Sequence, residues 1–374
     1  MHSALPADAG CRSRPTRLAA HLSDDQINFL PDGIPLVNAP TPLATPPESL
    51  SPRFINLAPT NGLTGLADVV KELTEGLLQP HASISPKFFY DALGSKLFEA
   101  ITALSEYYPT RTEGQIFKAI AQPLAKALED EGLQAPCLID LGAGNCEKAQ
   151  ALIPHLNPAQ YVPVDISADF LRDAAQQIQG SFAALDIVGV GMDFSNSLKL
   201  PGAVQAQKRV FFYPGSSLGN FAPEQALQFL KRISDPAEGQ AQALLLGIDM
   251  VKDSATLEAA YDDALGVTAA FNKNMLRHIN GLLGADFDVR QWRHVALFNT
   301  AESRIEMHLE ARRDVTVQWM NNSRRFAEGE RIHTESSYKY TVPSMTALLQ
   351  QAGFSKVQHW TDAQGWFGVF WAVV

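Results

Sequence analysis

The chain has 374 residues, of which 46% are hydrophobic and 19% charged, with 40 acidic and 30 basic side chains and a formal net charge of −10. This is enough apolar material for one large core or two smaller ones. There is no run of about 18 apolar residues that would span a membrane, and the start of the chain lacks the apolar stretch of a secretory signal. The acidic balance argues against a nucleic-acid surface. We therefore expect a cytoplasmic monomer whose partner is a small molecule, not nucleic acid or a membrane.

The thiols and histidines do not predict a metal site. Cys11, Cys137 and Cys146 are too few and too widely spaced for a disulfide framework or a four-ligand zinc site. The nine histidines lack metal-ligand spacing. We expect Glu306 and His308, which share a predicted strand, to be solvent-facing or structural. Cys146 has no histidine near it in sequence, so we expect no nucleophilic role for it.

Along the chain, the first 60 residues hold 10 of the 23 prolines, and proline opposes both helix and sheet. We predict a weakly structured leader over residues 1–60; a docking segment or lid is the alternative. Apolar residues at helical spacing over 66–77 and 97–104 then predict two helices, and the segment EYYPTR at 106–111 reads as a turn.

Between residues 137 and 249, short apolar runs alternate with helical patterns. This alternation predicts right-handed βαβ units and a parallel α/β sheet that is covered on both faces. A long helical stretch over 255–283 follows, and three segments after it are typical of antiparallel strands. The chain ends with a helix and two closing strands. We predict one domain from residues 61–250 and 341–374, and a smaller inserted domain from residues 251–340.

A glycine turn follows the apolar strand at 138–141 and precedes a helix, with Gly142 and Gly144 in the sequence DLGAG. Glycines let a ligand approach the backbone, and a helix N-terminus offers unpaired N–H groups. The turn therefore predicts a nucleotide-type ligand. It lacks the third glycine of the dinucleotide fingerprint and resembles the first motif of methyltransferases that use S-adenosylmethionine. A ligand-free turn is the alternative.

Two acidic residues end the strands that follow. Asp165 closes the segment YVPVD, about 20 residues after the glycine turn, where a carboxylate can accept hydrogen bonds from both ribose hydroxyls. It would serve equally well as a helix cap. Asp193 follows the next strand at the same sheet edge and suits an adenine amino group. Candidate ligand contacts at three successive strand ends support one binding site better than three unrelated features would.

The chain closely resembles the histidine-specific S-adenosylmethionine-dependent methyltransferases in the segments FFYDALGSKLFEAITALSEYYPTRTE, IDLGAGNCEKA, YVPVDIS, YPGSSLGNF, YDDALGVTAAFNKNML, SRIEMHL and TESSYKY. The resemblance runs from about residue 65 to the C-terminus. It implies S-adenosyl-L-methionine as cofactor and a Rossmann-like class I methyltransferase sheet with a smaller inserted α+β substrate-binding domain. In ergothioneine biosynthesis, members of this family trimethylate the α-amine of L-histidine to hercynine.

The resemblance also implies a role for individual residues. Tyr90 would lie beside the methyl-accepting amine, Phe98 would help to wall the pocket, and Tyr107 would face the imidazole. The backbone of Gly215 and the amide of Asn220 would position the amine and the carboxylate. Tyr90 and Gly215 are thus the implied catalytic residues.

Further implied contacts come from later segments. Tyr261 would donate its hydroxyl to the carboxylate, Met307 would pack on the imidazole, and Glu335 and Ser337 would bind its nitrogens. The implied cofactor contacts are Gly142, Gly144, Lys148, Asp165 and Asp193. Where the family often has Thr-Ile, this chain has Ser217-Leu218, which leaves Asn220 in place.

Physical chemistry supports the imidazole assignment, because a Glu and a Ser two residues apart on one strand face supply the acceptor and the donor that imidazole needs. Without the resemblance, both would read as polar residues on an exposed strand, and the aromatic residues and Met307 as core. Two rival functions stay open. One is methylation of another amine, such as a prenylated tryptophan, and the other is a catalytically silent binding protein.

Overall fold

The computed structural model describes residues 50–57, 63–195 and 197–374, which belong to one compact unit that begins at residue 47. Most of the predicted leader, including any docking segment or lid, lies outside these residues. Among the helices of the described ranges, none is long and apolar enough to cross a membrane.

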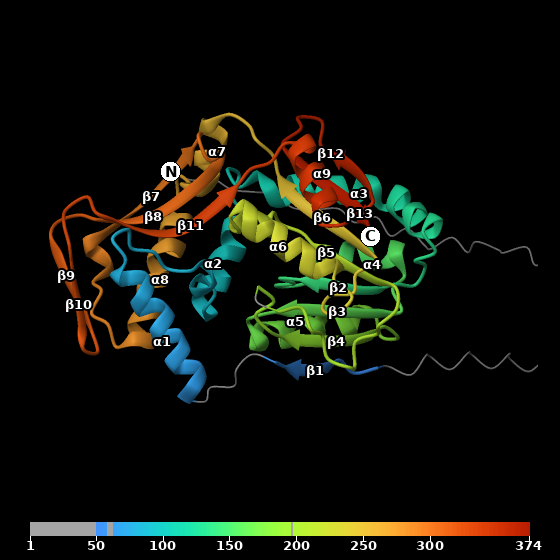
Figure 1. Cartoon of the computed structure of the whole chain (residues 1–374), viewed down its shortest axis with the longest axis horizontal. Helices are drawn as coiled ribbons and strands as arrows, with labels where there is room; N and C mark the ends of the chain where they lie inside the picture. The colour runs from blue at the N-terminus through green and yellow to red at the C-terminus, as the bar shows by residue number, and fades with distance from the viewer. Residues whose placement is uncertain (1–49, 58–62, 196) are drawn as a thin grey trace, which may run out of the picture. The chain divides into compact units, whose positions relative to one another are not determined.

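An eight-stranded sheet forms the larger part of the fold, in the order β1-β4-β3-β2-β5-β6-β13-β12 (Figure 1). Its strands are β1 (Arg53–Asn56), β2 (Cys137–Leu141), β3 (Gln160–Asp165), β4 (Asp186–Gly191), β5 (Arg209–Tyr213), β6 (Ala243–Asp249), β12 (Lys356–Thr361) and β13 (Phe367–Val373). Neighbours from β1 to β6 pair in parallel, whereas β13 is antiparallel to both β6 and β12. The predicted α/β class is confirmed.

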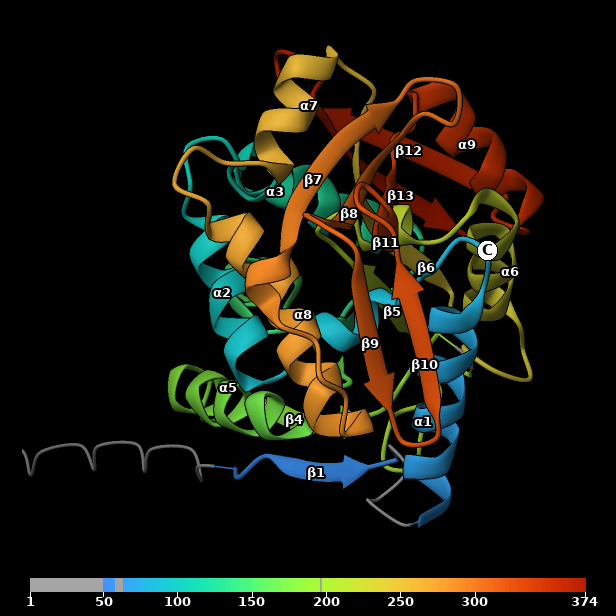
Figure 2. The same cartoon turned by 90° about the vertical axis from the view of Figure 1, so that its left-hand side faces the viewer.

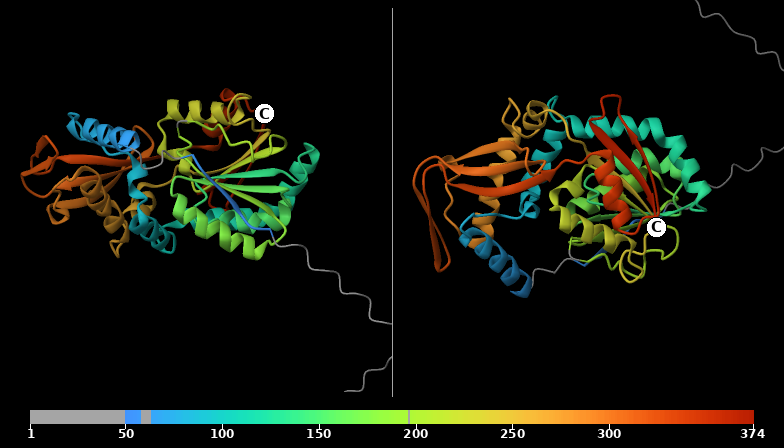
Figure 3. Two further views of the ribbon diagram at one scale, coloured as in Figure 1. Left: turned by 90° about the horizontal axis from the view of Figure 1, so that it is seen from below. Right: turned by 45° about the horizontal axis from the view of Figure 1, so that its top comes forward.

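Helices cover both faces of this sheet, as Figure 3 shows. One face packs on α3 (Tyr108–Asp130), α4 (Glu147–Leu156) and α5 (Ala168–Ser181), and the other on α6 (Pro223–Ser234) and α9 (Val342–Gln351). The central strands are therefore buried on both sides, which explains their continuous apolar runs. The strand order changes direction between β2 and β5, and open α/β sheets bind ligands at such a point.

A second core lies in the antiparallel part of the chain (Figure 2). It contains a three-stranded sheet of β7 (Trp292–Asn299), β8 (Arg304–Ala311) and β11 (Arg331–Tyr338), a hairpin of β9 (Val315–Trp319) and β10 (Asn322–Phe326), and the helices α7 (Ser254–Tyr261) and α8 (Val267–Leu283). The single helix predicted over 255–283 is wrong. Asp263 accepts hydrogen bonds from the amides of Val267 and Thr268, and Gly266 takes a φ of +75°, so a new helix begins there.

The structure differs from the sequence-based division in three other places. Arg53–Asn56, predicted as leader, form β1 at the sheet edge. The EYYPTR segment is not a free turn but leads into α3, because a proline fits in the first turn of a helix. The helices α1 (Leu63–Leu78), η1 (Pro86–Phe89) and α2 (Ala92–Thr102), predicted as part of the sheet domain, pack in the second core.

Candidate functional site

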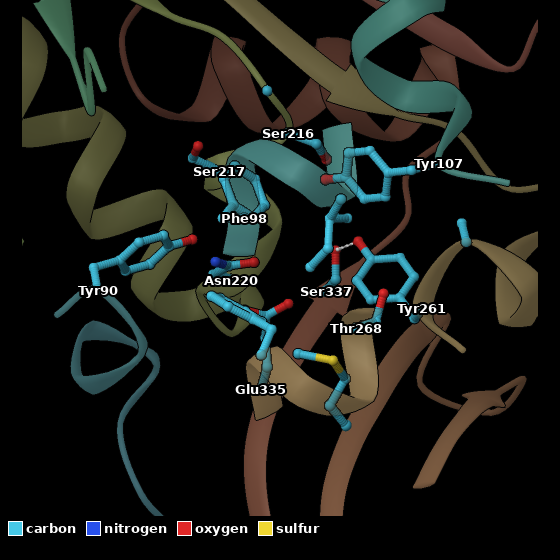
Figure 4. A pocket seen from close by; sticks show the side chains of 15 residues that line it. Tyr90, Phe98, Tyr107, Ser216, Ser217, Asn220, Tyr261, Thr268, Glu335 and Ser337 are labelled. Carbon is cyan, nitrogen blue, oxygen red and sulfur yellow. Dashed lines mark hydrogen bonds between the residues drawn. The ribbon is translucent and has the colours of Figure 1, made fainter. Parts of the chain in front are cut away.

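A cavity lies between the loop after β5 and the second core (Figure 4). All the residues that the resemblance assigns to the substrate line it. The lining residues are Tyr90, Phe98, Ile101, Tyr107, Gly215, Ser216, Ser217, Asn220, Ala260, Tyr261, Thr268, Phe271, Met307, Glu335 and Ser337. Sequence reasoning missed Thr268 and Phe271, which lie in the YDDALGVTAAFNKNML segment but carry no motif of their own.

Aromatic rings form one wall of this cavity. Tyr90 meets Phe98 edge to face at 5.8 Å between ring centroids, Phe98 meets Tyr107 at 6.2 Å, and Tyr107 meets Tyr261 at 6.3 Å. Burial, with a smaller contribution from the negative charge of Glu335, raises the pKa of Tyr90 well above its usual value. The Tyr90 phenol therefore keeps its proton and acts as a neutral hydroxyl.

The polar end of the cavity comes from β11, where Glu335 and Ser337 share one strand face after an irregularity between His333 and Glu335. The Glu335 side chain is buried, with 8% of its surface exposed. Burial raises the pKa of Glu335 to about 7, although the charge of Lys339 acts in the opposite direction. Glu335, Asn220 and Tyr90 all line this cavity, as Figure 4 shows.

Ser337 and Tyr261 form a hydrogen-bonded pair in the cavity wall. The Tyr261 hydroxyl donates to Ser337 Oγ at 2.9 Å. Lys339 Nζ donates to Ser337 Oγ at 2.9 Å and to the Tyr261 hydroxyl at 3.1 Å. Sequence reasoning missed Lys339; the only signal was a charged residue in the apolar-flanked segment SSYKYTV.

At the sheet edge, the glycine turn after β2 has the geometry of a ligand cradle. Gly142 and Gly144 take left-handed φ angles of +68° and +53°. A Cβ at Gly144 would meet nothing within 4 Å, and one at Gly142 would meet only Phe194, so the space above the turn is open. This opening fits a nucleoside-type cofactor that lies against the backbone.

Asp165 at the end of β3 holds this turn in place. Its Oδ2 accepts from the Gly144 amide at 3.0 Å, and its Oδ1 accepts from the Ser167 amide at 2.9 Å. Burial raises the pKa of Asp165, while these amides favour its charged form. Asp193 follows β4, and its Oδ1 accepts from the Ser195 amide at 3.0 Å. Both carboxylates lie at the carboxyl ends of parallel strands, as the sequence predicts.

A buried carboxylate that sequence reasoning missed joins the cofactor turn to the cavity. Glu113 on α3 accepts from the Gly215 amide at 2.8 Å with Oε1, and its Oε2 lies 2.7 Å from Lys148 Nζ. A Cβ at Gly247 would lie 1.9 Å from Glu113 Oε1, so this glycine makes room for the carboxylate. Gly215 lines the cavity, whereas Lys148 lies on α4 directly after the glycine turn.

The remaining candidates lie outside the cavity lining. Burial raises the pKa of the Cys146 thiol to about 12, so it is not poised as a nucleophile. His308 Nε2 lies 3.0 Å from Glu306 Oε2, and Glu306 also accepts from Arg304 at 2.8 Å, which is a structural network on β8. Within the described ranges, no three His, Cys, Asp or Glu residues are grouped to hold a metal ion.

Comparison with known proteins gives a match over residues 69–374 to the family described as histidine-specific methyltransferase, SAM-dependent. The chain is 39% identical to the histidine N-alpha-methyltransferase of Mycolicibacterium smegmatis, with 81% of this chain and 94% of that one covered. The identity to the enzyme of the same name from Mycobacterium tuberculosis is 40%, with 80% and 92% covered. The chain is 27% identical to the 4-dimethylallyltryptophan N-methyltransferase of Arthroderma benhamiae, with 78% of this chain and 89% of that one covered.

The sheet agrees with the expected Rossmann-like fold, because its strands from β1 to β6 are parallel and helices cover both faces. The open glycine turn fits the S-adenosylmethionine on which the family depends. From the family match and the extent of these identities, the chain belongs to the histidine-specific S-adenosylmethionine-dependent methyltransferases and is an N-methyltransferase.

Proposed function

We propose that the protein transfers methyl groups from S-adenosylmethionine to the α-amine of L-histidine, stepwise to the trimethylated product hercynine. The observation that carries this proposal is the polar end of the cavity. There Glu335 offers an acceptor and Ser337 a hydroxyl, two residues apart on one strand face, which matches the two nitrogens of a neutral imidazole. The names of the two mycobacterial relatives support the same substrate.

Methyl transfer from a sulfonium is an in-line displacement that needs a neutral nitrogen lone pair on the acceptor. When bound, the cofactor supplies the electrophilic methyl group, and Gly142, Gly144, Lys148, Asp165 and Asp193 would hold it. Because Tyr90 keeps its proton, its oxygen would orient the amine by accepting an N–H, without removing the proton. The shared contact of Glu113 with Lys148 and Gly215 supports adjacent cofactor and amine positions.

Successive methylation adds bulk to the amine and removes its N–H donors. Orientation would therefore come from the substrate's carboxylate, through Asn220, and from its imidazole, through Glu335 and Ser337. The Tyr261 hydroxyl, which the resemblance assigns to the carboxylate, donates its hydrogen to Ser337 instead. The trimethylated product is a permanent cation, and the neighbouring rings of Tyr90 and Phe98 offer it aromatic faces. These features favour a pocket that accepts every methylation state of the amine.

Mass spectrometry of L-histidine incubated with the protein and S-adenosylmethionine tests the proposal. L-Tryptophan and 4-dimethylallyltryptophan serve as parallel acceptors. Gains of one, two and three methyl groups on histidine alone are the expected result. Methylation of the tryptophan derivative in place of histidine would assign the other amine. If no acceptor gains mass although S-adenosylhomocysteine binds, the protein is a silent binding homologue.

A further inference from the structure

The hydroxyls of Ser337 and Tyr261 carry two hydrogens, and their mutual hydrogen bond uses only one of them. A hydroxyl carries one hydrogen and accepts at its lone pairs. One of the two hydrogens is used in the 2.9 Å bond between the residues. Lys339 Nζ donates to both oxygens and has no lone pair with which to accept. Among the described residues, neither hydroxyl has another recorded acceptor, and both side chains line the cavity, so the second hydroxyl hydrogen is free to point into it.

Lys339 is held in this position by a buried carboxylate. Its ammonium lies 2.7 Å from Asp249 Oδ2, and both side chains are fully buried. Asp249 also lies 2.6 Å from Lys252 Nζ and accepts from the Tyr108 hydroxyl at 2.8 Å. Burial alone would raise the pKa of Asp249, but the two lysines outweigh it and lower the pKa. An ionised Asp249 thus keeps a cation directly behind the cavity wall.

We propose that Lys339 is a positioning residue that fixes the Ser337–Tyr261 pair as a hydrogen-bond donor toward the substrate. It thereby selects a ligand whose facing atom carries a lone pair. The inference rests on the proposed histidine substrate, whose unprotonated imidazole nitrogen is such an atom. Glu335 would accept from the protonated imidazole nitrogen. The pocket would therefore bind the neutral imidazole selectively. It would disfavour an imidazolium, which has no lone pair, and an indole, which has no acceptor.

The test measures L-histidine affinity by calorimetry in the presence of S-adenosylhomocysteine. The variant K339M removes the ammonium and keeps the length of the side chain. The matched control is K252M, which removes an equally close ammonium from the same Asp249 but does not contact Ser337 or Tyr261. We expect K339M to weaken histidine binding about tenfold or more and K252M less than about threefold. S-adenosylhomocysteine affinity reports whether each variant is folded.

A double-mutant cycle with S337A separates positioning from a general structural effect. In the S337A background, the effect of K339M should shrink at least about threefold, because one of the two hydroxyls that Lys339 orients is gone. Equal losses in K339M and K252M would overturn the inference, and so would an unchanged K339M effect in S337A. If K339M does not fold, the same comparison of histidine affinity is made between D249N/K339M and D249N. A wild-type protein that binds no histidine would refute the proposed function itself, and the inference with it.

Discussion

The Glu335 side chain is buried and lines the cavity. Its folded-state pKa is raised from 4.5 to about 7. The folded state therefore binds a proton more tightly than the unfolded chain does. The contribution of Glu335 to stability is fully present below its unfolded pKa and is lost as the pH rises through its folded pKa. At pH 8 the ionised side chain thus lowers stability, while it offers the substrate an acceptor.

The variant E335Q should separate these two effects. At pH 8 we expect it to unfold at a higher temperature than the wild type, with a gain of roughly 3 kcal/mol at most, because a neutral amide replaces a buried charge. At pH 4 the gain should nearly vanish. Histidine affinity should fall about tenfold at pH 8, since a charged acceptor is lost, while S-adenosylhomocysteine affinity stays the same. Thermal melts and calorimetry at both pH values check this; a gain at pH 4 equal to that at pH 8 would contradict it.

The variant D165N tests whether Asp165 belongs to the cofactor site. In D165N the amide would present an N–H to one of the two backbone amides that the carboxylate now accepts from. We therefore expect S-adenosylhomocysteine to bind about tenfold more weakly, or worse. The matched control is D173N, the same substitution at an exposed position of α5. Unchanged cofactor affinity in D165N, measured by calorimetry, would remove Asp165 from the cofactor site.

How far the sequence predicts a site residue depends on where its partners lie. Gly142, Asp165 and Glu335 stand in local segments whose pattern is visible in the sequence. Lys339 and Glu113 were missed because their importance comes from distant contacts. Lys339 contacts Tyr261, 78 positions away, and Glu113 contacts Gly215, 102 positions away. Only the fold brings these polar groups together and buries them.

At the scale of elements, the contact between α3 and β6 depends on the missing side chain of Gly247. In G247A the new methyl would displace Glu113 from the Gly215 amide, because its Cβ would lie 1.9 Å from Oε1. We expect a loss of about 1–3 kcal/mol in the free energy of unfolding by urea, together with slower methyl transfer.

The control for G247A is G281A on the exposed side of α8, where a Cβ would meet nothing within 4 Å. Alanine in a helix loses less conformational entropy on folding, so G281A should gain about 0.5–1 kcal/mol and keep its activity. A G247A protein as stable and active as G281A would show that Glu113 does not need its present position.

The elements themselves follow from the sequence where a pattern is long and local. The central βαβ units show buried apolar strands and amphipathic helices, and both are present. β1 has only four residues, stands next to a proline and pairs with β4 more than 130 positions away, so no local signal reveals it. The sequence around Pro109 does not distinguish a turn from the start of α3, because proline suits both a turn and the first turn of a helix.

At the scale of the whole described unit, the chain interleaves its two cores. The second core takes α1, η1 and α2 from before β2, and α7 to β11 from after β6. The eight-stranded sheet is completed by β12 and β13, the last two strands in sequence. Neither core is a continuous piece of chain, and the cavity takes residues from both sides.

We therefore expect the two cores to unfold as one cooperative unit. Pulse-labelling hydrogen exchange in urea should give the same midpoint for peptides from β5 and β6 as for peptides from β8 and β11. S-adenosylhomocysteine, whose proposed contacts lie at the large sheet, should stabilise both sets equally, by about 2.7 kcal/mol at one hundred times its dissociation constant. If the ligand protected only the sheet peptides, or if two midpoints appeared, the cores would be independent. The contact of Glu113 with Gly215 and Lys148 would then be too weak to couple the cofactor turn to the cavity.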